Sequence, residues 1–358
     1  MVQVHAQGLR KEFGSLVAVE EFDLTIDEGE FVTLVGPSGC GKTTTLRMFA
    51  GLETATAGRL LFGDRDVTDL PPQERDVALL FQDIALYPHM SVRDNMAYGL
   101  KIAGYAKPDR YERVEETADL LQITDLLDNR PADLSGGQQQ RVALGRSMVR
   151  DPALFLFDEP MSDLDAKLKR DLRPLFEEVT KEIGCPTLYV THDQEEAMTM
   201  SDRIVVMDDG RIAQVGGPEE LYDDPDSEFV GTFIGQPTMQ TFQGRVVEER
   251  DGLAVEVGEH RWPVSTRNGL AEYTDRPIRV GVRPQDISVT EDTSGGLAGE
   301  HVLDEPLGDR TNSFFDTPEG RVTVVTPKGF RGEGRAYGLR PSSSELRLFD
   351  PDSGLRIR

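Results

Sequence analysis

Residues 31–43 read FVTLVGPSGCGKT and place a glycine-rich loop directly after a short apolar run. The run Phe31–Val35 does not alternate, as in a strand buried on both faces, and a helical pattern follows the loop. The loop fits G-x-x-x-x-G-K-[ST], in which the glycines let backbone N–H groups wrap a phosphate. Lys42 can reach the outer phosphates, the Thr43 hydroxyl can bind Mg²⁺, and the helix N-terminus adds positive potential. The predicted nucleotide-binding positions here are Gly36, Pro37, Ser38, Gly39, Cys40, Gly41, Lys42, Thr43 and Thr44.

The segments beyond this loop predict an α/β fold built on a parallel sheet with crossover helices. Short apolar runs recur at 76–81, 153–157 and 187–190, and helical patterns separate them, notably at 165–183. Between the first two runs the sequence is almost wholly helical, as at 109–127. We therefore expect an inserted helical subdomain at about 88–150.

A second domain is expected after residue 235. From there the sequence shifts to short strands broken by Gly and Pro. The charge excess also falls, because residues 1–235 hold 44 acidic and 23 basic side chains, whereas residues 236–358 hold 20 and 16. These changes predict one domain at 1–235 and a separate β-rich domain at 236–358.

The composition narrows the possible partners. Over 358 residues, 64 Asp and Glu face 39 Lys and Arg, a net charge of −25 that argues against binding to nucleic acid or anionic lipid. Only 8 of the basic residues are Lys, which favours adaptation to high salt, with an ordinary acidic cytosolic protein as the alternative. No apolar run reaches the roughly 20 residues of a membrane span, and no secretory signal is visible.

The two cysteines are too few for a disulfide framework and agree with a reducing compartment. Cys40 lies inside the phosphate loop. We interpret it as a small space-filling residue, with a redox switch as the alternative.

Two carboxylates follow the apolar run at 154–157. Residues at the carboxyl end of a parallel strand face the ligand crevice. Asp158 is therefore predicted to bind Mg²⁺, directly or through water, and Glu159 to polarise an attacking water. The alternative is an ordinary solvated strand end.

A third motif, LSGGQ at 134–138, precedes a helix predicted at 139–150. It again brings a Ser hydroxyl, glycine amides and a helix N-terminus toward an anion. With this pentapeptide the chain resembles the ATPase subunits of ABC transporters. The resemblance implies that the motif faces the γ-phosphate of ATP held by an opposing subunit, so that two composite sites form in a head-to-tail dimer. The positions concerned are Ser135, Gly136, Gly137 and Gln138.

The same resemblance implies roles for single residues. Phe13 would stack on adenine, and otherwise is a strand-end aromatic. Gln82 would contact Mg²⁺ and the attacking water, and His192 the γ-phosphate; the alternative for His192 is a helix-capping surface residue. The loop at 162–165 would lie at the dimer interface, although Asp163 stands where the family usually has Asn. The implied catalytic residues are Glu159, His192 and Gln82, and the implied metal positions are Thr43, Gln82 and Asp158.

Residues 81–101, FQDIALYPHMSVRDNMAYGLK, are most similar to the ATPases of maltose and glycerol-phosphate importers. In that group this stretch forms a groove for a helix of the membrane-spanning subunit, with Leu86, Tyr87 and Met90 as the apolar contacts here. The C-terminal domain resembles the group's oligonucleotide-binding-fold (OB-fold) regulatory domain.

The resemblance implies a sugar-importing ATPase that uses ATP and Mg²⁺ and lies peripherally on the cytoplasmic face of the cell membrane. Its implied partners are a second copy or close homologue, two membrane-spanning permease subunits and, indirectly, an extracellular binding protein. No nucleic acid or direct lipid contact is expected. The alternatives are import of polyamine, iron, sulfate or phosphonate and, in another class, a soluble ABC ATPase acting on ribosomes or DNA. A regulatory binder without turnover conflicts with Lys42, Glu159 and His192.

Overall fold

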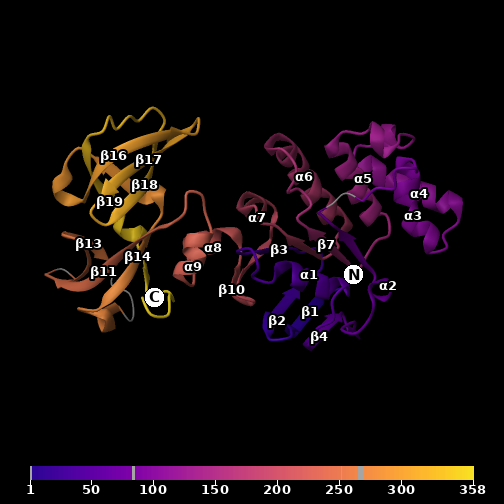
Figure 1. Ribbon diagram of the computed structural model, residues 1–358, viewed down its shortest axis with the longest axis horizontal. Helices are drawn as coiled ribbons and strands as arrows, with labels where there is room; N and C mark the ends of the chain where they lie inside the picture. The colour runs from indigo at the N-terminus through magenta and orange to yellow at the C-terminus, as the bar shows by residue number, and fades with distance from the viewer. Residues whose placement is uncertain (1, 83–84, 251, 265–269) are drawn as a thin grey trace. The chain divides into compact units, whose positions relative to one another are not determined.

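The computed structural model describes residues 2–82, 85–250, 252–264 and 270–358. It forms two compact units, the first ending at Pro218 and the second beginning at Glu219; Figure 1 labels the elements of both. The expected change of domain near residue 235 therefore lies inside the second unit. No helix in the described ranges is long and apolar enough to cross a membrane.

The first unit is built on a six-stranded sheet. Its strands, in spatial order, are β10 (Arg211–Gly216), β9 (Arg203–Asp208), β3 (Phe31–Val35), β8 (Thr187–Val190), β7 (Leu154–Asp158) and β6 (Val77–Leu80). All neighbouring strands pair in parallel except β10, which runs antiparallel to β9. The predicted parallel sheet is thus confirmed. Strand β3 is buried along its whole length, as its unbroken apolar run predicted.

A smaller antiparallel sheet lies beside α1 (Lys42–Ala50). Its strands are, in order, β2 (Leu16–Ile26), β1 (Val4–Phe13), β4 (Ala57–Phe62) and β5 (Arg65–Asp66). Helix α1 packs between the two sheets in one apolar cluster. Within it, the rings of Phe22 of β2 and Phe49 of α1 meet edge-to-face with 6.3 Å between their centroids. Burial on both sides fixes the helix whose N-terminus follows the glycine-rich loop.

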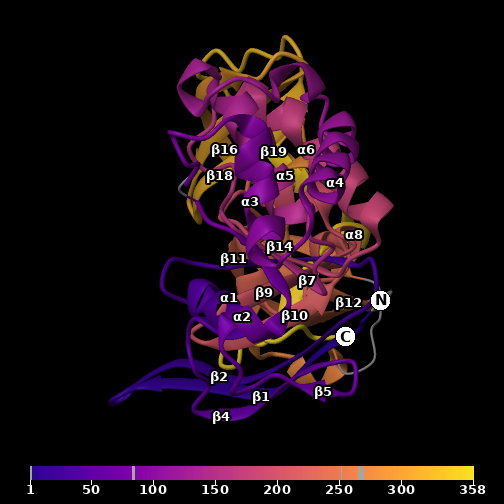
Figure 2. The ribbon, with the colours of Figure 1, turned by 90° about the vertical axis from the view of Figure 1, so that its right-hand side faces the viewer.

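Helices α3, α4 and α5 gather at one side of the first unit, away from the small sheet (Figure 2). The helices of this unit are α1 (Lys42–Ala50), α2 (Pro72–Arg75), α3 (Val92–Ile102), α4 (Lys107–Leu120), α5 (Gly136–Met148), α6 (Ala166–Ile183) and α7 (Gln194–Met200), with 3₁₀ turns at Thr124–Leu126 and Pro131–Asp133. Apolar residues of α3 to α7 share one core with the central sheet, including Met96, Leu144 and Phe157.

Two helices begin or end at residues other than those predicted. The helix expected at 109–127 stops at Leu120, because Gln122 has a left-handed φ of 55° that ends the helical path. The helix expected at 139–150 begins three residues earlier, at Gly136, because the Ser135 side chain caps it.

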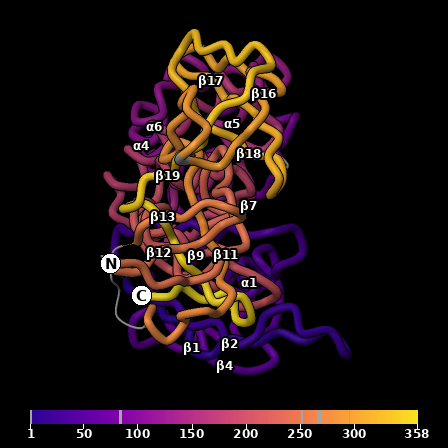
Figure 3. The backbone as a smooth tube through the Cα atoms, turned by 90° about the vertical axis from the view of Figure 1, so that its left-hand side faces the viewer, coloured from indigo at the N-terminus to yellow at the C-terminus, as the bar shows by residue number. Residues whose placement is uncertain are grey.

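The second unit contains two five-stranded antiparallel sheets (Figure 3). One has the order β13 (His260–Val264), β12 (Gly252–Val257), β11 (Gln240–Glu249), β14 (Pro277–Val282) and β20 (Arg347–Phe349). The other has the order β15 (Ile287–Thr290), β19 (Ala336–Pro341), β16 (Leu297–Pro306), β17 (Arg310–Thr317) and β18 (Gly320–Pro327). One apolar core joins their inner faces. The predicted β-rich C-terminal part is confirmed.

Two short helices, α8 (Pro218–Asp223) and α9 (Glu228–Phe233), connect to these sheets. Arg283 has no exposed surface and donates hydrogen bonds to the carbonyl oxygens of Tyr222, Gly231 and Ile234. The guanidinium thus satisfies carbonyls at the ends of both helices. This contact explains why the helices belong with the β-rich unit.

Candidate nucleotide-binding site

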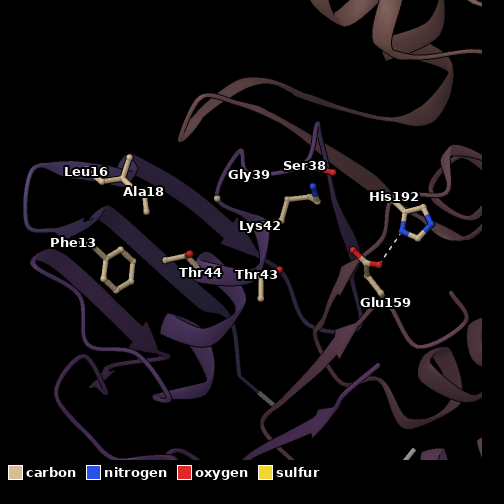
Figure 4. Close-up of a pocket in the computed structure, with 11 residues that line it drawn as sticks. Phe13, Leu16, Ala18, Ser38, Gly39, Lys42, Thr43, Thr44, Glu159 and His192 are labelled. Atoms are coloured by element: carbon tan, nitrogen blue, oxygen red, sulfur yellow. Dashed lines mark hydrogen bonds and ion pairs between the residues drawn. The ribbon is translucent and has the colours of Figure 1, made fainter. Parts of the chain in front are cut away.

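A pocket of about 500 Å³ lies beside the carboxyl ends of β3, β7 and β8 (Figure 4). Phe13, Leu16 and Ala18 line one end of it. Its middle is formed by Ser38, Gly39, Gly41, Lys42, Thr43 and Thr44. Glu159 and His192 form the opposite end. An apolar end, a loop rich in N–H donors and a carboxylate–imidazole pair match the base, the phosphates and the reacting end of a nucleotide.

The middle of the pocket is suited to an anion. No side chain caps α1 at Gly41, so the N–H groups of its first turn remain for a ligand. Lys42 is only 7% exposed, and its Nζ donates to the carbonyl oxygens of Gly36, at 2.8 Å, and Pro37, at 3.0 Å. A buried ammonium bonded only to neutral groups gains a stronger, charge-assisted bond from a phosphate. The loop therefore fits the predicted nucleotide.

Two glycines let the loop lie against the rest of the unit. A Cβ on Gly36, where φ is 155°, would lie 2.3 Å from the Met207 carbonyl oxygen and 2.6 Å from Cys40 Sγ. A Cβ on Gly41 would lie 2.5 Å from the Ala18 carbonyl oxygen. Cys40 is buried beneath the loop, with its Sγ 3.7 Å from Lys42 Nζ. Gly36, Pro37 and Cys40 shape the loop without lining the pocket itself.

Glu159 and His192 come from neighbouring strand ends and share a hydrogen bond of 2.8 Å between Glu159 Oε2 and His192 Nδ1. Glu159 has a left-handed φ of 47°, which for a residue with a side chain costs about 1–3 kcal/mol. Its N–H donates to Val190 O of β8 at 2.9 Å, which holds the turn. The strained turn directs the carboxylate into the pocket (Figure 4).

Asp158, the last residue of β7, is partly buried beside Glu159. Burial, followed by the negative charge of Glu159, raises the pKa of the Asp158 carboxyl above its usual value, although Arg47 opposes the shift. A cation would relieve this repulsion. Because Mg²⁺ is commonly held by one or two protein groups together with substrate phosphates, Thr43 and Asp158 are suitable ligands for it.

The remaining predicted residues lie outside this pocket. Gln82 is exposed and directly precedes residues 83–84, which are outside the described residues. Ser135 begins α5 in a capping box, in which the Ser135 N–H donates to Gln138 Oε1 at 2.9 Å and the Gln138 N–H donates to Ser135 Oγ at 3.4 Å. Among the residues that the structure describes, the lining of this pocket does not include positions 135–138. A single chain thus does not bring LSGGQ to its own phosphate loop.

Three contacts at the site were not predicted. Leu16 and Ala18 extend the apolar end beside Phe13; the only signal for them was two large apolar residues, Phe13 and Leu16, on either side of a turn. Gln140 of α5 is 1% exposed, and its Nε2 donates at 2.5 Å to the carbonyl oxygen of Pro160, the residue that follows Glu159. No local pattern announces a contact between positions twenty residues apart.

The fold and site define a P-loop nucleotide hydrolase. Residues 19–162 match the ABC transporter family. The chain is 45% identical over 357 residues to the sulfoquinovosyl glycerol transport ATP-binding protein SmoE of Agrobacterium fabrum, covering 98% of each chain. It is 48% identical to the xylose/arabinose import ATP-binding protein XacK of Haloferax volcanii, covering 95% of this chain and 90% of that one.

It is also 50% identical to the diacetylchitobiose uptake system ATP-binding protein MsiK of Streptomyces coelicolor, covering 95% and 94% of the two chains. Among solved structures, the dimeric post-hydrolysis state of the ATP-binding cassette MJ0796 bound to ADP and Pi aligns with a TM-score of 0.53 at 29% identity. That alignment covers 60% of this chain and 98% of the other. The chain therefore belongs to the ATP-binding subunits of ABC transporters, as its motifs indicated.

Proposed function

We propose that this chain hydrolyses ATP to drive the uptake of a sugar through membrane-spanning partner subunits. The observation that carries the proposal is the pocket that unites the Lys42 loop, the open N-terminus of α1 and the Glu159–His192 pair. Relatives named for sulfoquinovosyl glycerol, xylose/arabinose and diacetylchitobiose support a sugar as the transported solute.

In this proposal each part of the pocket has one task. Phe13, with Leu16 and Ala18, packs against the base, while Lys42 and the first turn of α1 bind the outer phosphates. Glu159 orients the attacking water and accepts its proton, and His192 holds the γ-phosphate end. Thr43 and Asp158, with Gln82 as a further contact, would hold Mg²⁺, which would supply charge neutralisation at the phosphates.

We further propose that two copies, or this chain and a close homologue, complete each other's sites. Positions 135–138 and the loop at 162–165, with Asp163, would meet the nucleotide of the opposing chain. These positions lie at the beginning of a helix of 13 residues, where an anion is favoured, although the capping box already engages the N–H groups of Ser135 and Gln138. MJ0796, a dimer bound to ADP and Pi, supports this arrangement by similarity.

The proposed location is the cytoplasmic face of the membrane, reached by docking on permease subunits. Leu86, Tyr87 and Met90 are the proposed apolar contacts. Tyr87 is 37% exposed, and its ring lies tilted against that of Tyr98 with 4.8 Å between the ring centroids. Residues 1–235 serve in this proposal as the ATP-binding domain, with the helical subdomain at 88–150 meeting the permeases. Residues 236–358 serve as an OB-fold-like regulatory domain.

Replacing Glu159 by Gln tests the catalytic assignment. The steady-state ATPase rate should fall about 10²–10⁴-fold, because the general base is lost, while ATP affinity measured by equilibrium binding is kept. Glu177→Gln, at an exposed ion pair on α6, is the matched control and should hydrolyse ATP normally. Normal turnover by Glu159→Gln contradicts the assignment.

The solute is tested with the complete transporter in proteoliposomes. ATP-dependent uptake of a labelled mono- or oligosaccharide is expected, and it should disappear with Glu159→Gln. Uptake of polyamine, iron, sulfate or phosphonate without any sugar uptake would overturn the sugar assignment but leave the ATPase assignment standing.

A further inference from the structure

A buried carboxylate lies beneath the loop that carries His192. Glu196 of α7 is 2% exposed, and its Oε2 accepts hydrogen bonds from Tyr189 OH, at 2.8 Å, and Thr191 Oγ1, at 2.7 Å. Tyr189 and Thr191 are themselves almost fully buried. One carboxylate oxygen therefore fixes the chain immediately before His192.

The chain immediately after His192 is fixed by the same group of charges. Asp193 accepts hydrogen bonds at Oδ1 from the N–H groups of Glu195 and Glu196, and so caps α7. Its other oxygen, Oδ2, accepts a bond of 3.0 Å from Lys169 Nζ. Lys169 Nζ also lies 3.2 Å from Glu196 Oε1, so one ammonium joins both carboxylates.

His192 alone in this loop points outward. Its side chain is 59% exposed and meets Glu159, whereas the side chains on either side of it bond into the interior. Lys169 belongs to α6, whose N-cap Asp165 ends the loop at 162–165. The ammonium therefore links the His192 loop to the helix that follows this proposed interface loop.

Folding stability alone does not generally favour charges at buried positions. Replacing a buried ion pair by packed neutral groups of similar volume is often neutral or stabilising, because burial of the charges is costly. Lys169 and Glu196 are 13% and 2% exposed at their side chains. This buried ion pair also bonds to the residues on both sides of the exposed His192 imidazole. Such an arrangement suggests that the pair serves to position the imidazole.

We propose that Glu196 and Lys169 are positioning residues for His192. They hold the imidazole where it meets Glu159 and connect its loop to α6. This inference rests on the proposed hydrolysis of ATP at Glu159, and it adds that the geometry of the His192 loop limits turnover.

The test removes both charges at once, with Lys169→Met/Glu196→Gln, so that neither is left buried without the other, while Asp193 keeps Arg173 at 3.6 Å. Because a misplacement of about 1 Å can slow a reaction about 100-fold, kcat for ATP should fall roughly 10–100-fold while KM stays within about twofold. The thermal midpoint should stay near that of the parent chain. The control Lys181→Met/Glu177→Gln removes an exposed pair from the same helix and should leave kcat and KM unchanged.

A spectroscopic measurement separates positioning from a purely structural role. The chain has 5 histidines, so the Cε1–H resonance of His192 can be assigned in the full-length protein by its loss in His192→Gln. This resonance should shift in the Lys169→Met/Glu196→Gln chain and stay in place in the control. If that chain does not fold, Thr191→Val removes one of the two bonds to Glu196 Oε2 without changing charge and should shift the same resonance.

Unchanged kcat with an unshifted His192 resonance overturns the inference, as does a kcat that falls only together with the thermal midpoint. Failure of the proposed function is distinguishable, since it requires that Glu159→Gln turn over normally. Loss of turnover in Glu159→Gln combined with full turnover in the double variant rejects the positioning role alone.

Discussion

Gly36 shows how closely the phosphate loop lies against its surroundings. In Gly36→Ala the new Cβ meets backbone and sulfur at 2.3 Å and 2.6 Å, so the loop must shift. We expect the free energy of unfolding to fall by about 1–3 kcal/mol and nucleotide affinity to fall with it. Urea titration and binding of a fluorescent ATP analogue measure the two effects.

Gly104→Ala is the matched control, because Gly104 also has a left-handed φ, 87°, but its Cβ would meet nothing within 4 Å. It should lose some stability through backbone strain and keep full nucleotide affinity. Equal loss of affinity in both variants would contradict the role of close contact at Gly36.

Cys185 is predicted to be chemically inert in the folded chain. Burial raises the pKa of its thiol to about 12, and its Sγ donates to Pro152 O at 3.0 Å. The thiolate is the reactive form, so iodoacetamide at about pH 8 should leave Cys185 unmodified in the native protein and alkylate it in urea. Mass spectrometry of tryptic peptides reads this out. Native labelling at the rate of a free thiol would count against the buried position.

Local sequence was sufficient for residues whose role depends on their immediate neighbours. The phosphate loop before Thr43 and the carboxylates at the end of β7 were predicted because a strand, a turn and a helix follow each other along the chain. Gln140 and Glu196 were not, since their partners, Pro160 and Lys169, lie on separate elements. Such pairs depend on the packing of helices, which periodicity does not specify.

Among the elements, α8 and α9 are joined to the β-rich unit by several contacts, and Arg283, which has no exposed surface, makes the most buried of them. Arg283 bonds three helix-end carbonyls, and its guanidinium lies 4.0 Å from the Tyr222 ring centroid. Arg283→Met leaves these carbonyls without their donor. We expect the second unit to lose roughly 2–5 kcal/mol of unfolding free energy in chemical denaturation.

Arg261→Met provides the comparison, because Arg261 pairs with Glu256 on the surface and is 53% exposed. It should cost less than about 1 kcal/mol. A similar small loss for Arg283→Met would show that the helices are held by other contacts.

The compositional boundary and the boundary between the compact units differ in position. Composition changes near residue 235, but the compact units divide between Pro218 and Glu219. Charge and Gly or Pro content describe the surface and turns of a segment. Contacts such as those of the buried Arg283 guanidinium, which join α8 and α9 to the β-rich unit, leave no mark on that composition. Buried strands such as β3 and β8 were predicted to the residue, because each apolar run is cut off sharply by polar or turn residues.

Over the whole molecule, a net charge of −25 should make stability depend on salt. Self-repulsion weakens as the screening length falls from about 10 Å at 0.1 M to about 3 Å at 1 M salt. The thermal midpoint is therefore expected to rise between about 0.1 M and 2 M KCl, measured by circular dichroism. A matched series in sorbitol controls for solvent exclusion. A flat response to KCl supports the alternative of an ordinary acidic protein.

The chain leaves the central sheet at Leu80 and rejoins it at Leu154, in the strand next door. Because β6 and β7 are neighbouring strands, the segment between them is an insertion into the sheet. Its length and its outer face can change without moving the strands that position the ATP site. If the proposed docking holds, recognition of new permeases could evolve on this inserted segment wherever it leaves Gln82 and positions 135–138, the proposed nucleotide contacts within it, in place. This topology offers a physical reason why one catalytic scaffold could serve transporters for many different solutes.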